Sequence, residues 1–207
     1  YWMKKFRILL LLFATLFMLA ACSNNEDDDN KHSQKNAPKN VQNISEDDIF
    51  SSSKTGEKIS TAEMNKAIKK YLDVNSDIID NKYLMQYKLD RQTGTDTKIT
   101  DKQAQRLSKL SQNAVKNDVR FKKFIESNDL PEGYKPHAER ILKYFTALNS
   151  TIKNVDKDIE ELDYQPQNKL NVVDVSAKHA GDVNGKQQKK IKQFLEKHDI
   201  NSDAIDK

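Results

Sequence analysis

Apolar residues recur every three or four positions through most of the chain after residue 60, a spacing that places them on one face of an α-helix. The first series follows Ser60-Thr61-Ala62-Glu63, a Ser-x-x-Glu sequence typical of a helix-starting capping box. We therefore predict a helix from about Thr61 to Leu89, followed by a loop over 91–99. Its apolar positions are Met64, Ile68, Tyr71, Leu72, Ile78, Ile79, Leu84, Met85 and Leu89.

A second capping box, Thr100-Asp101-Lys102-Gln103, opens a second predicted helix that ends near Asn128. The segment from Leu130 to Pro136 contains two prolines and one glycine, which predicts a turn. The apolar positions of this second helix are Leu107, Leu110, Ala114, Phe121, Phe124 and Ile125.

The most regular pattern follows this turn and alternates steps of three and four residues, as in a heptad repeat. It predicts a third long helix, which needs a partner for its apolar stripe. An antiparallel neighbour within the chain is favoured over a dimeric coiled coil, because the first two helices also expose apolar faces. The stripe consists of Ala138, Ile141, Phe145, Leu148, Ile152, Val155, Ile159 and Leu162.

The C-terminal part is less regular. Leu170, Val172, Val173 and Val175 suggest a short extended segment, and a turn at 182–185 leads into a short amphipathic helix over 186–198. Residues from Asn201 onward are expected to fray. Together the patterns predict an all-α fold over residues 58–207, a small bundle of three long helices with a short C-terminal helix.

The N-terminus has a different pattern. Lys4, Lys5 and Arg7 precede an apolar run from Ile8 to Leu19, which is shorter than the roughly 20 residues needed to cross a bilayer. The run ends in Leu19-Ala20-Ala21-Cys22, which reads as a lipobox before the only cysteine. We predict that residues 1–21 are a signal peptide and that Cys22 carries a diacylglyceryl group. The mature chain would be anchored on the extracytoplasmic face of a bacterial membrane.

Residues 22–57 are rich in Asn, Asp, Ser and Lys, and this composition predicts a disordered tether between anchor and body. Ile44, Ile49 and Phe50 are candidates for a short piece that docks on the body. The acidic run at 26–29, with His32 nearby, is interpreted as a solvated spacer rather than a metal site, because a flexible carboxylate cluster lacks preorganised geometry.

Composition narrows the functional classes. With 36% hydrophobic and 32% charged residues, the chain has room for one modest domain. Its formal charge of +4 becomes nearly neutral once the three signal-peptide cations are removed, so no basic field for nucleic acid is expected. The histidines are scattered without metal-ligand spacing, and no catalytic motif is present, so we expect no metal, no cofactor and no catalytic residues. These histidines are His32, His137, His179 and His198.

Two polar residues interrupt the apolar stripe of the second predicted helix. Asn117 and Asp118 flank the direction defined by Ala114 and Phe121, so two polar side chains lie at the margin of a core-facing stripe. They are either a binding site or structural groups that satisfy backbone amides in the loop at 129–134. Their neighbours Arg120 and Lys123 are expected to face solvent.

The residues Asn117, Asp118 and Phe121, the lipobox before Cys22 and a Lys-rich helix after 182–185 resemble the NDxxF motif lipoproteins of Gram-positive cocci. The resemblance spans most of the chain. It implies a lipid-anchored surface protein in which Asn117, Asp118 and Phe121 matter, and it implies no particular reaction.

Three functional hypotheses follow. The first is a non-catalytic surface module that binds an envelope protein, peptide or other envelope component, and it agrees best with the missing catalytic motifs. The second is a small-solute-binding lipoprotein, which an apolar cavity beside Asn117 and Asp118 would favour. The third is an envelope-acting hydrolase, which a deep pocket with perturbed acids would favour.

Overall fold

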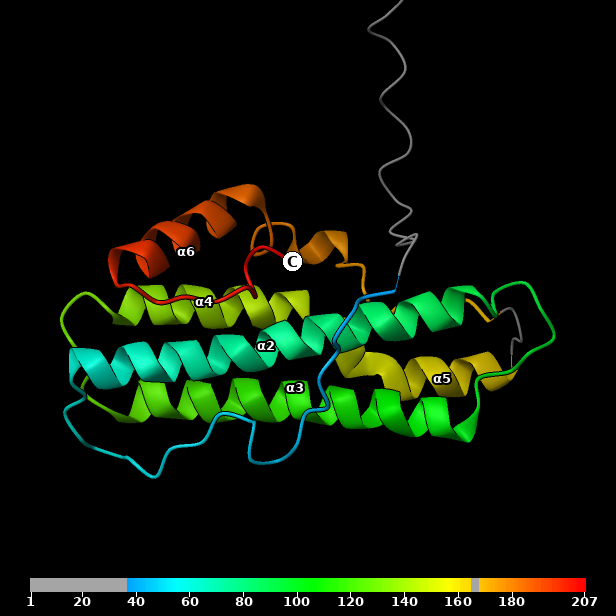
Figure 1. The fold of residues 1–207 in the computed structure, drawn as a ribbon, viewed down its shortest axis with the longest axis horizontal. Coiled ribbons are helices and arrows are strands. Elements are labelled where there is room, and N and C mark those ends of the chain that lie inside the picture. The colour runs from blue at the N-terminus through cyan, green and yellow to red at the C-terminus, as the bar shows by residue number, and fades with distance from the viewer. Residues whose placement is uncertain (1–36, 165–167) are drawn as a thin grey trace, which may run out of the picture. The chain divides into compact units, whose positions relative to one another are not determined.

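A computed structural model describes residues 37–164 and 168–207. Every regular element in this part of the chain is helical, which confirms the predicted all-α class. The signal peptide, the lipobox, Cys22 and the acidic run with His32 lie outside the described residues. The elements are α2 (Thr61–Asp90), α3 (Asp101–Ser127), α4 (Lys135–Leu148), η1 (Ile152–Asn154), α5 (Val155–Tyr164), η2 (Ala177–His179) and α6 (Gly185–Lys197) (Figure 1).

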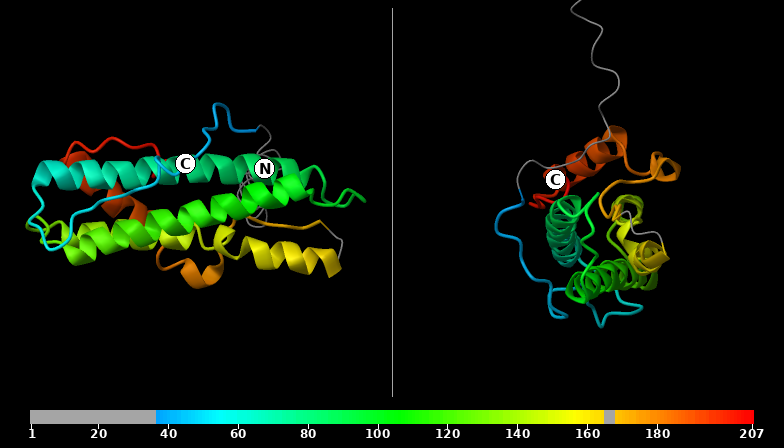
Figure 2. Two further views of the ribbon diagram at one scale, coloured as in Figure 1. Left: turned by 90° about the horizontal axis from the view of Figure 1, so that it is seen from below. Right: turned by 90° about the vertical axis from the view of Figure 1, so that its right-hand side faces the viewer.

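Helices α2 and α3 begin where the two capping boxes place them. The Ser60 hydroxyl accepts a hydrogen bond from the Glu63 amide at 3.3 Å, and the Glu63 carboxylate accepts one from the Ser60 amide at 2.9 Å. Thr100 and Gln103 make the same reciprocal pair at the start of α3. The two long helices then run antiparallel, side by side (Figures 1 and 2).

The third predicted helix is interrupted. The heptad pattern over 138–162 predicted one continuous helix, but α4 ends at Leu148 and α5 begins at Val155, with the short η1 turn between them. Ile152 in this turn is fully buried, so the apolar spacing continues although the helix does not. The body therefore has two long helices, a third that is broken into two shorter ones, and α6.

Polar contacts explain the break. The ammonium of Lys82 donates to the carbonyl oxygen of Leu148 at 2.8 Å, and this is an acceptor that a continuous helix would need for its own ladder. The next residue, Asn149, is fully buried, and its amide donates to Asn75 Oδ1 at 2.8 Å. The run Asn149-Ser150-Thr151 also consists of weak helix formers, so the local preference does not oppose the interruption.

The C-terminal part packs more fully than the sequence predicted. Helix α6 contacts α4, and its N-cap is the Asn184 side chain, which accepts from the Gln187 amide at 3.0 Å. The prediction that residues from Asn201 onward fray is wrong, because Ala204 and Ile205 are only 2% and 4% exposed. Their apolar side chains join the core beside α6.

The segment predicted to be extended near residues 170–175 is buried but forms no strand among the described residues. Gln86 on α2 replaces the missing sheet partner. Its Oε1 accepts from the Val172 amide at 2.8 Å, and its Nε2 donates to the Leu170 carbonyl at 3.1 Å. One side chain thus satisfies the backbone of an irregular segment.

Residues 44–59, here called the N-terminal strap, pack on the helices. Ile44, Ile49 and Phe50 are 7%, 0% and 3% exposed, so they belong to the core of the body. The predicted domain boundary at residue 58 therefore falls inside a packed segment. The strap follows α3 in the same direction, and it ends where the Ile59 amide donates to the Asp129 carbonyl at 2.8 Å (Figure 2).

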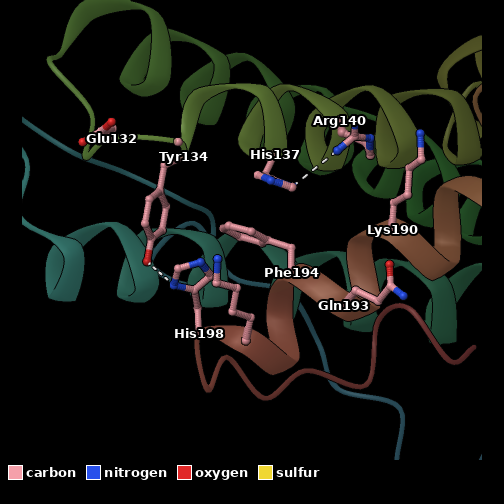
Figure 3. Close-up of a pocket in the computed structure, with 10 residues that line it drawn as sticks. Glu132, Tyr134, His137, Arg140, Lys190, Gln193, Phe194 and His198 are labelled. Carbon is pink, nitrogen blue, oxygen red and sulfur yellow. Dashed lines mark hydrogen bonds between the residues drawn. The ribbon is translucent and has the colours of Figure 1, made fainter.

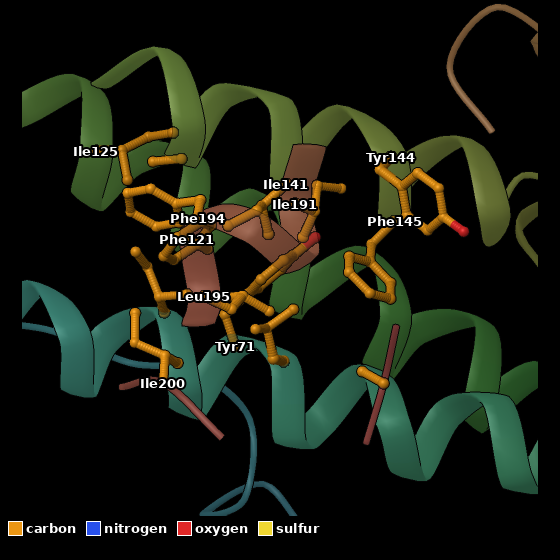
Figure 4. Close-up of a cluster of buried hydrophobic side chains, with 14 of the residues drawn as sticks. Tyr71, Phe121, Ile125, Ile141, Tyr144, Phe145, Ile191, Phe194, Leu195 and Ile200 are labelled. Atoms are coloured by element: carbon orange, nitrogen blue, oxygen red, sulfur yellow. The ribbon is translucent and has the colours of Figure 1, made fainter. Parts of the chain in front are cut away.

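Two hydrophobic clusters form the core. One lies between α2, α3, α4 and α6 and is rich in aromatic rings, including Tyr71, Phe121, Phe145 and Phe194 (Figure 4). The other surrounds Ile78, Leu107 and Ile152 and lies toward α5. No helix in residues 37–164 or 168–207 is both long and apolar enough to cross a membrane.

Candidate functional site

Asn117 is fully buried and joins three parts of the fold. From α3, its Oδ1 accepts from the Phe50 amide in the strap at 3.1 Å, and its Nδ2 donates to the Tyr71 carbonyl on α2 at 3.1 Å. One amide side chain therefore ties the strap to the two long helices.

Asp118 is 5% exposed and accepts hydrogen bonds from three other residues. The Tyr71 hydroxyl donates to its Oδ1 at 2.7 Å, and Thr146 Oγ1 donates to its Oδ2 at 3.1 Å. The Lys153 ammonium forms an ion pair with the same Oδ2 at 2.7 Å. A charged partner and two hydroxyls offset the cost of burying this carboxylate.

Phe121 completes the motif as a packing residue. Its ring stacks on Tyr71 at a centroid distance of 4.2 Å and meets Phe50 edge-on at 5.2 Å.

Burial and the adjacent Asp118 carboxylate raise the pKa of the Tyr71 hydroxyl well above its usual value, so this hydroxyl stays a donor. The three motif residues thus position one face of α3 against α2 and the strap.

The polar network continues to the break between α4 and α5. Asn75 donates to the Tyr71 carbonyl at 3.0 Å and accepts from Asn149, which lies 3.4 Å from the Lys82 ammonium. Burial lowers the pKa of Lys82 to about 8. Among the described residues, no buried side-chain nitrogen or oxygen lacks a hydrogen-bond partner.

Asn117 and Asp118 have other partners than the structural interpretation assigned to them. The structural interpretation assigned them to amides in the loop at 129–134, whereas their partners belong to the strap, α2, α4 and η1. Arg120 is also not simply in solvent, because its guanidinium pairs with Glu46 of the strap. The geometry of the motif is that of a closed packing junction.

A separate pocket of about 510 Å³ opens between α4 and α6 (Figure 3). Tyr134 and Phe194, which are nearly buried, form its aromatic part, and Phe194 stacks on the His137 ring at a centroid distance of 4.3 Å. We call this the α4–α6 pocket. It is lined by Glu132, Gly133, Tyr134, His137, Arg140, Lys190, Gln193, Phe194, Lys197 and His198.

The charge at the α4–α6 pocket is predominantly positive. Arg140, Lys190 and Lys197 line it, against the single carboxylate of Glu132. In Figure 3, Glu132 lies at the end of the pocket opposite Lys190. The cationic end is therefore not neutralised by this carboxylate.

Hydrogen bonds assign the proton positions of the two histidines. Asn65 Nδ2 donates to the His198 carbonyl at 3.1 Å, so Asn65 Oδ1 is the acceptor for the Tyr134 hydroxyl at 2.8 Å. The Tyr134 oxygen then accepts from His198 Nδ1–H at 2.7 Å, so the hydrogen bond places a proton on this ring nitrogen.

The Arg140 guanidinium can only donate, so its 3.3 Å contact with His137 Nδ1 places the proton of neutral His137 on Nε2. Burial lowers the pKa of His137, and the nearby charges of Arg140 and Lys197 lower it further. His137 is therefore a neutral N–H donor at pH 7. The cluster combines cationic and neutral donors on one wall.

Sequence reasoning missed this pocket because its residues come from two helices far apart in the chain. A signal was nevertheless present on each helix. Tyr134, His137 and Arg140 recur every three residues, and Lys190, Phe194 and Lys197 recur at steps of four and three, so each set shares one helical face.

The described residues form an all-α body with a closed polar junction and a cationic pocket between α4 and α6. Comparisons with protein-family models, with curated proteins and with solved structures find no match to this chain.

Proposed function

We propose that this chain is a lipid-anchored, non-catalytic binding module on the outer face of a bacterial membrane, related to the NDxxF motif lipoproteins. The α4–α6 pocket is its binding surface for an envelope component. The lipobox sequence ending at Cys22 supports the anchor, since a diacylglyceryl group provides the two acyl chains that stable membrane attachment needs.

The observation that carries the binding role is the contrast between the two polar sites. The side chains of Asn117 and Asp118 are buried and bound to protein partners. The α4–α6 pocket instead presents cations and ring nitrogens at the surface. Ligands bind where polar groups converge in an accessible concave site, so the pocket is the better candidate.

Cell fractionation followed by crosslinking tests both parts of the proposal. Wild-type protein is expected in the membrane fraction, and a Cys22→Ser variant is expected to lose acylation and the processing that depends on it. Intact membranes that carry wild type or Lys190→Gln are then crosslinked and purified. Lys189→Gln is the matched control, because Lys189 is exposed on the same helix but does not line the pocket.

A specific envelope component should be recovered with wild type and Lys189→Gln and be depleted with Lys190→Gln. Equal recovery with both variants would reject the pocket as the binding surface. Unchanged acylation of the Cys22→Ser protein would reject the anchor.

A small-solute-binding lipoprotein is the second candidate. The pocket volume of about 510 Å³ favours it, because this lies within the range of sites for small organic ligands. Direct titration with soluble ligands separates the two functions.

A further inference from the structure

We infer that the α4–α6 pocket is a binding site for a phosphate-bearing anion, with Arg140 and Lys190 as its principal cationic contacts. The inference rests on the proposed function in one respect only, namely that the pocket is the binding surface. It adds the chemical class of the ligand.

Three cations line the pocket without a carboxylate partner among the described residues, although two other lysines on the same helices have one. On the same two helices, Lys143 forms an ion pair with Asp182 at 2.9 Å, and Lys192 pairs with Asp206. Arg140, Lys190 and Lys197 form no ion pair with any carboxylate of residues 37–164 or 168–207. Like charges gathered in one hollow repel each other, and a bound anion relieves that repulsion.

The donors that line the pocket are of the types that bind phosphate. A guanidinium offers a planar set of N–H groups that matches two oxygens of a phosphate, and a lysine ammonium adds a compact point charge. His137 contributes a further N–H at Nε2, for which the described residues supply no acceptor. This set suits a group with several anionic oxygens better than a single carboxylate.

Three of the donors, Arg140, His137 and His198, are held in place by neighbouring side chains. Phe194 lies in a ring cluster with His137 at 4.3 Å and His198 at 4.6 Å, and Arg140 is tied to His137 Nδ1. His198 is fixed by Tyr134, whose hydroxyl is held in turn by Asn65 on α2. Preorganised donors lose little entropy when they bind a ligand.

The pocket is larger than a phosphate group alone requires. The pocket's volume of about 510 Å³ leaves room for an organic group beside the phosphate, and its apolar wall is formed by Tyr134 and Phe194. A soluble phosphate ester and the headgroup of an anionic phospholipid share this chemistry. The test therefore includes both sources.

The experiment is isothermal titration of the full-length protein, purified from membranes in a nonionic detergent. The probes are inorganic phosphate, glycerol 3-phosphate and dihexanoyl phosphatidylglycerol, with acetate as an anion that lacks phosphorus. The variants are Lys190→Gln, Arg140→Gln and the control Lys189→Gln. Melting curves accompany each variant, and the exposed Lys190 provides a test that does not depend on Arg140 packing.

At least one phosphate-bearing probe should bind wild type and Lys189→Gln equally, with affinity about tenfold lower in Lys190→Gln, the effect typical of losing one charge-assisted hydrogen bond. Preference for glycerol 3-phosphate identifies a soluble ester, and preference for the lipid analogue identifies a headgroup. Both results support the inference.

The inference is overturned if no phosphate-bearing probe binds, if acetate binds as tightly, or if Lys190→Gln behaves like the control. These failures are distinct from failure of the proposed function. If the crosslinking experiment still recovers a pocket-dependent component, the binding module stands and only the ligand class is wrong.

Discussion

At the scale of single residues, the most informative feature is the different use of two polar sets. Asn117 and Asp118 are buried and hydrogen-bond to other parts of the protein. Arg140 and His137 instead line a surface pocket. The sequence predicted the first pair as special because they interrupt an apolar stripe. It could not predict their partners, since Phe50 lies 67 residues away in a segment with few apolar positions.

An Asn117→Ala substitution is expected to lower the free energy of unfolding by about 2 kcal/mol, because it leaves the buried Phe50 amide without an acceptor. Urea denaturation of the variant beside Gln112→Ala, an exposed position on the same helix, measures this effect. Equal stability of the two variants would show that the junction does not hold the strap.

At the scale of elements, local signals predicted helix starts well and helix continuity poorly. The capping boxes at Ser60 and Thr100 act through residues three apart, so the sequence contains all the information needed. The interruption after Leu148 depends on Lys82, which is 66 residues away in the chain. The α4–α6 pocket likewise could not be predicted, because neither helix contains the whole site.

The strap is expected to open as a unit when its aromatic anchor is removed. Phe50→Ala deletes the ring that contacts Phe121 and Phe124, at a cost of about 3 kcal/mol. Hydrogen exchange should then be fast at the Gly56 and Ile59 amides, which bond to Ser127 at the end of α3 and to Asp129, while amides within α3 stay protected. Loss of protection throughout α3 would instead make the strap part of one cooperative unit with the helices.

At the scale of the whole molecule, one buried amine makes the free energy of unfolding depend on pH. Lys82 has a pKa of about 8 in the fold, against an ordinary value of 10.5, so keeping it charged opposes folding below pH 8. This cost, about 3 kcal/mol at pH 7, diminishes as the pH rises from 8 toward 10.5, because the unfolded chain then binds more protons than the native one.

The wild-type free energy of unfolding should therefore rise by about 2 kcal/mol between pH 7 and pH 9.5, relative to a Lys82→Met variant. Denaturant-induced unfolding at several pH values measures the difference. The pH range ends below the ordinary pKa of tyrosine. A constant difference between the two proteins would mean that Lys82 keeps its ordinary pKa in the fold. Both proteins contain the same tyrosines and carboxylates, so their other titrations cancel.

The direction of the strap has a mechanical consequence. The strap follows α3 from Asn113 to the end of the helix and continues to Asp129. A pulling force that lifts its N-terminal side off the body would therefore act first on the contact of Ile44 with Asn113, then on Phe50, and last on Ile59. When a segment is peeled, its contacts break one after another. This needs less force than shearing, in which all the contacts must break together. Peeling residues 44–59 would release roughly 50 Å of chain at about 3.4 Å per residue, while Asp118 still joins α2, α3 and α4. The strap would thus detach and extend under force before the helical body unfolds.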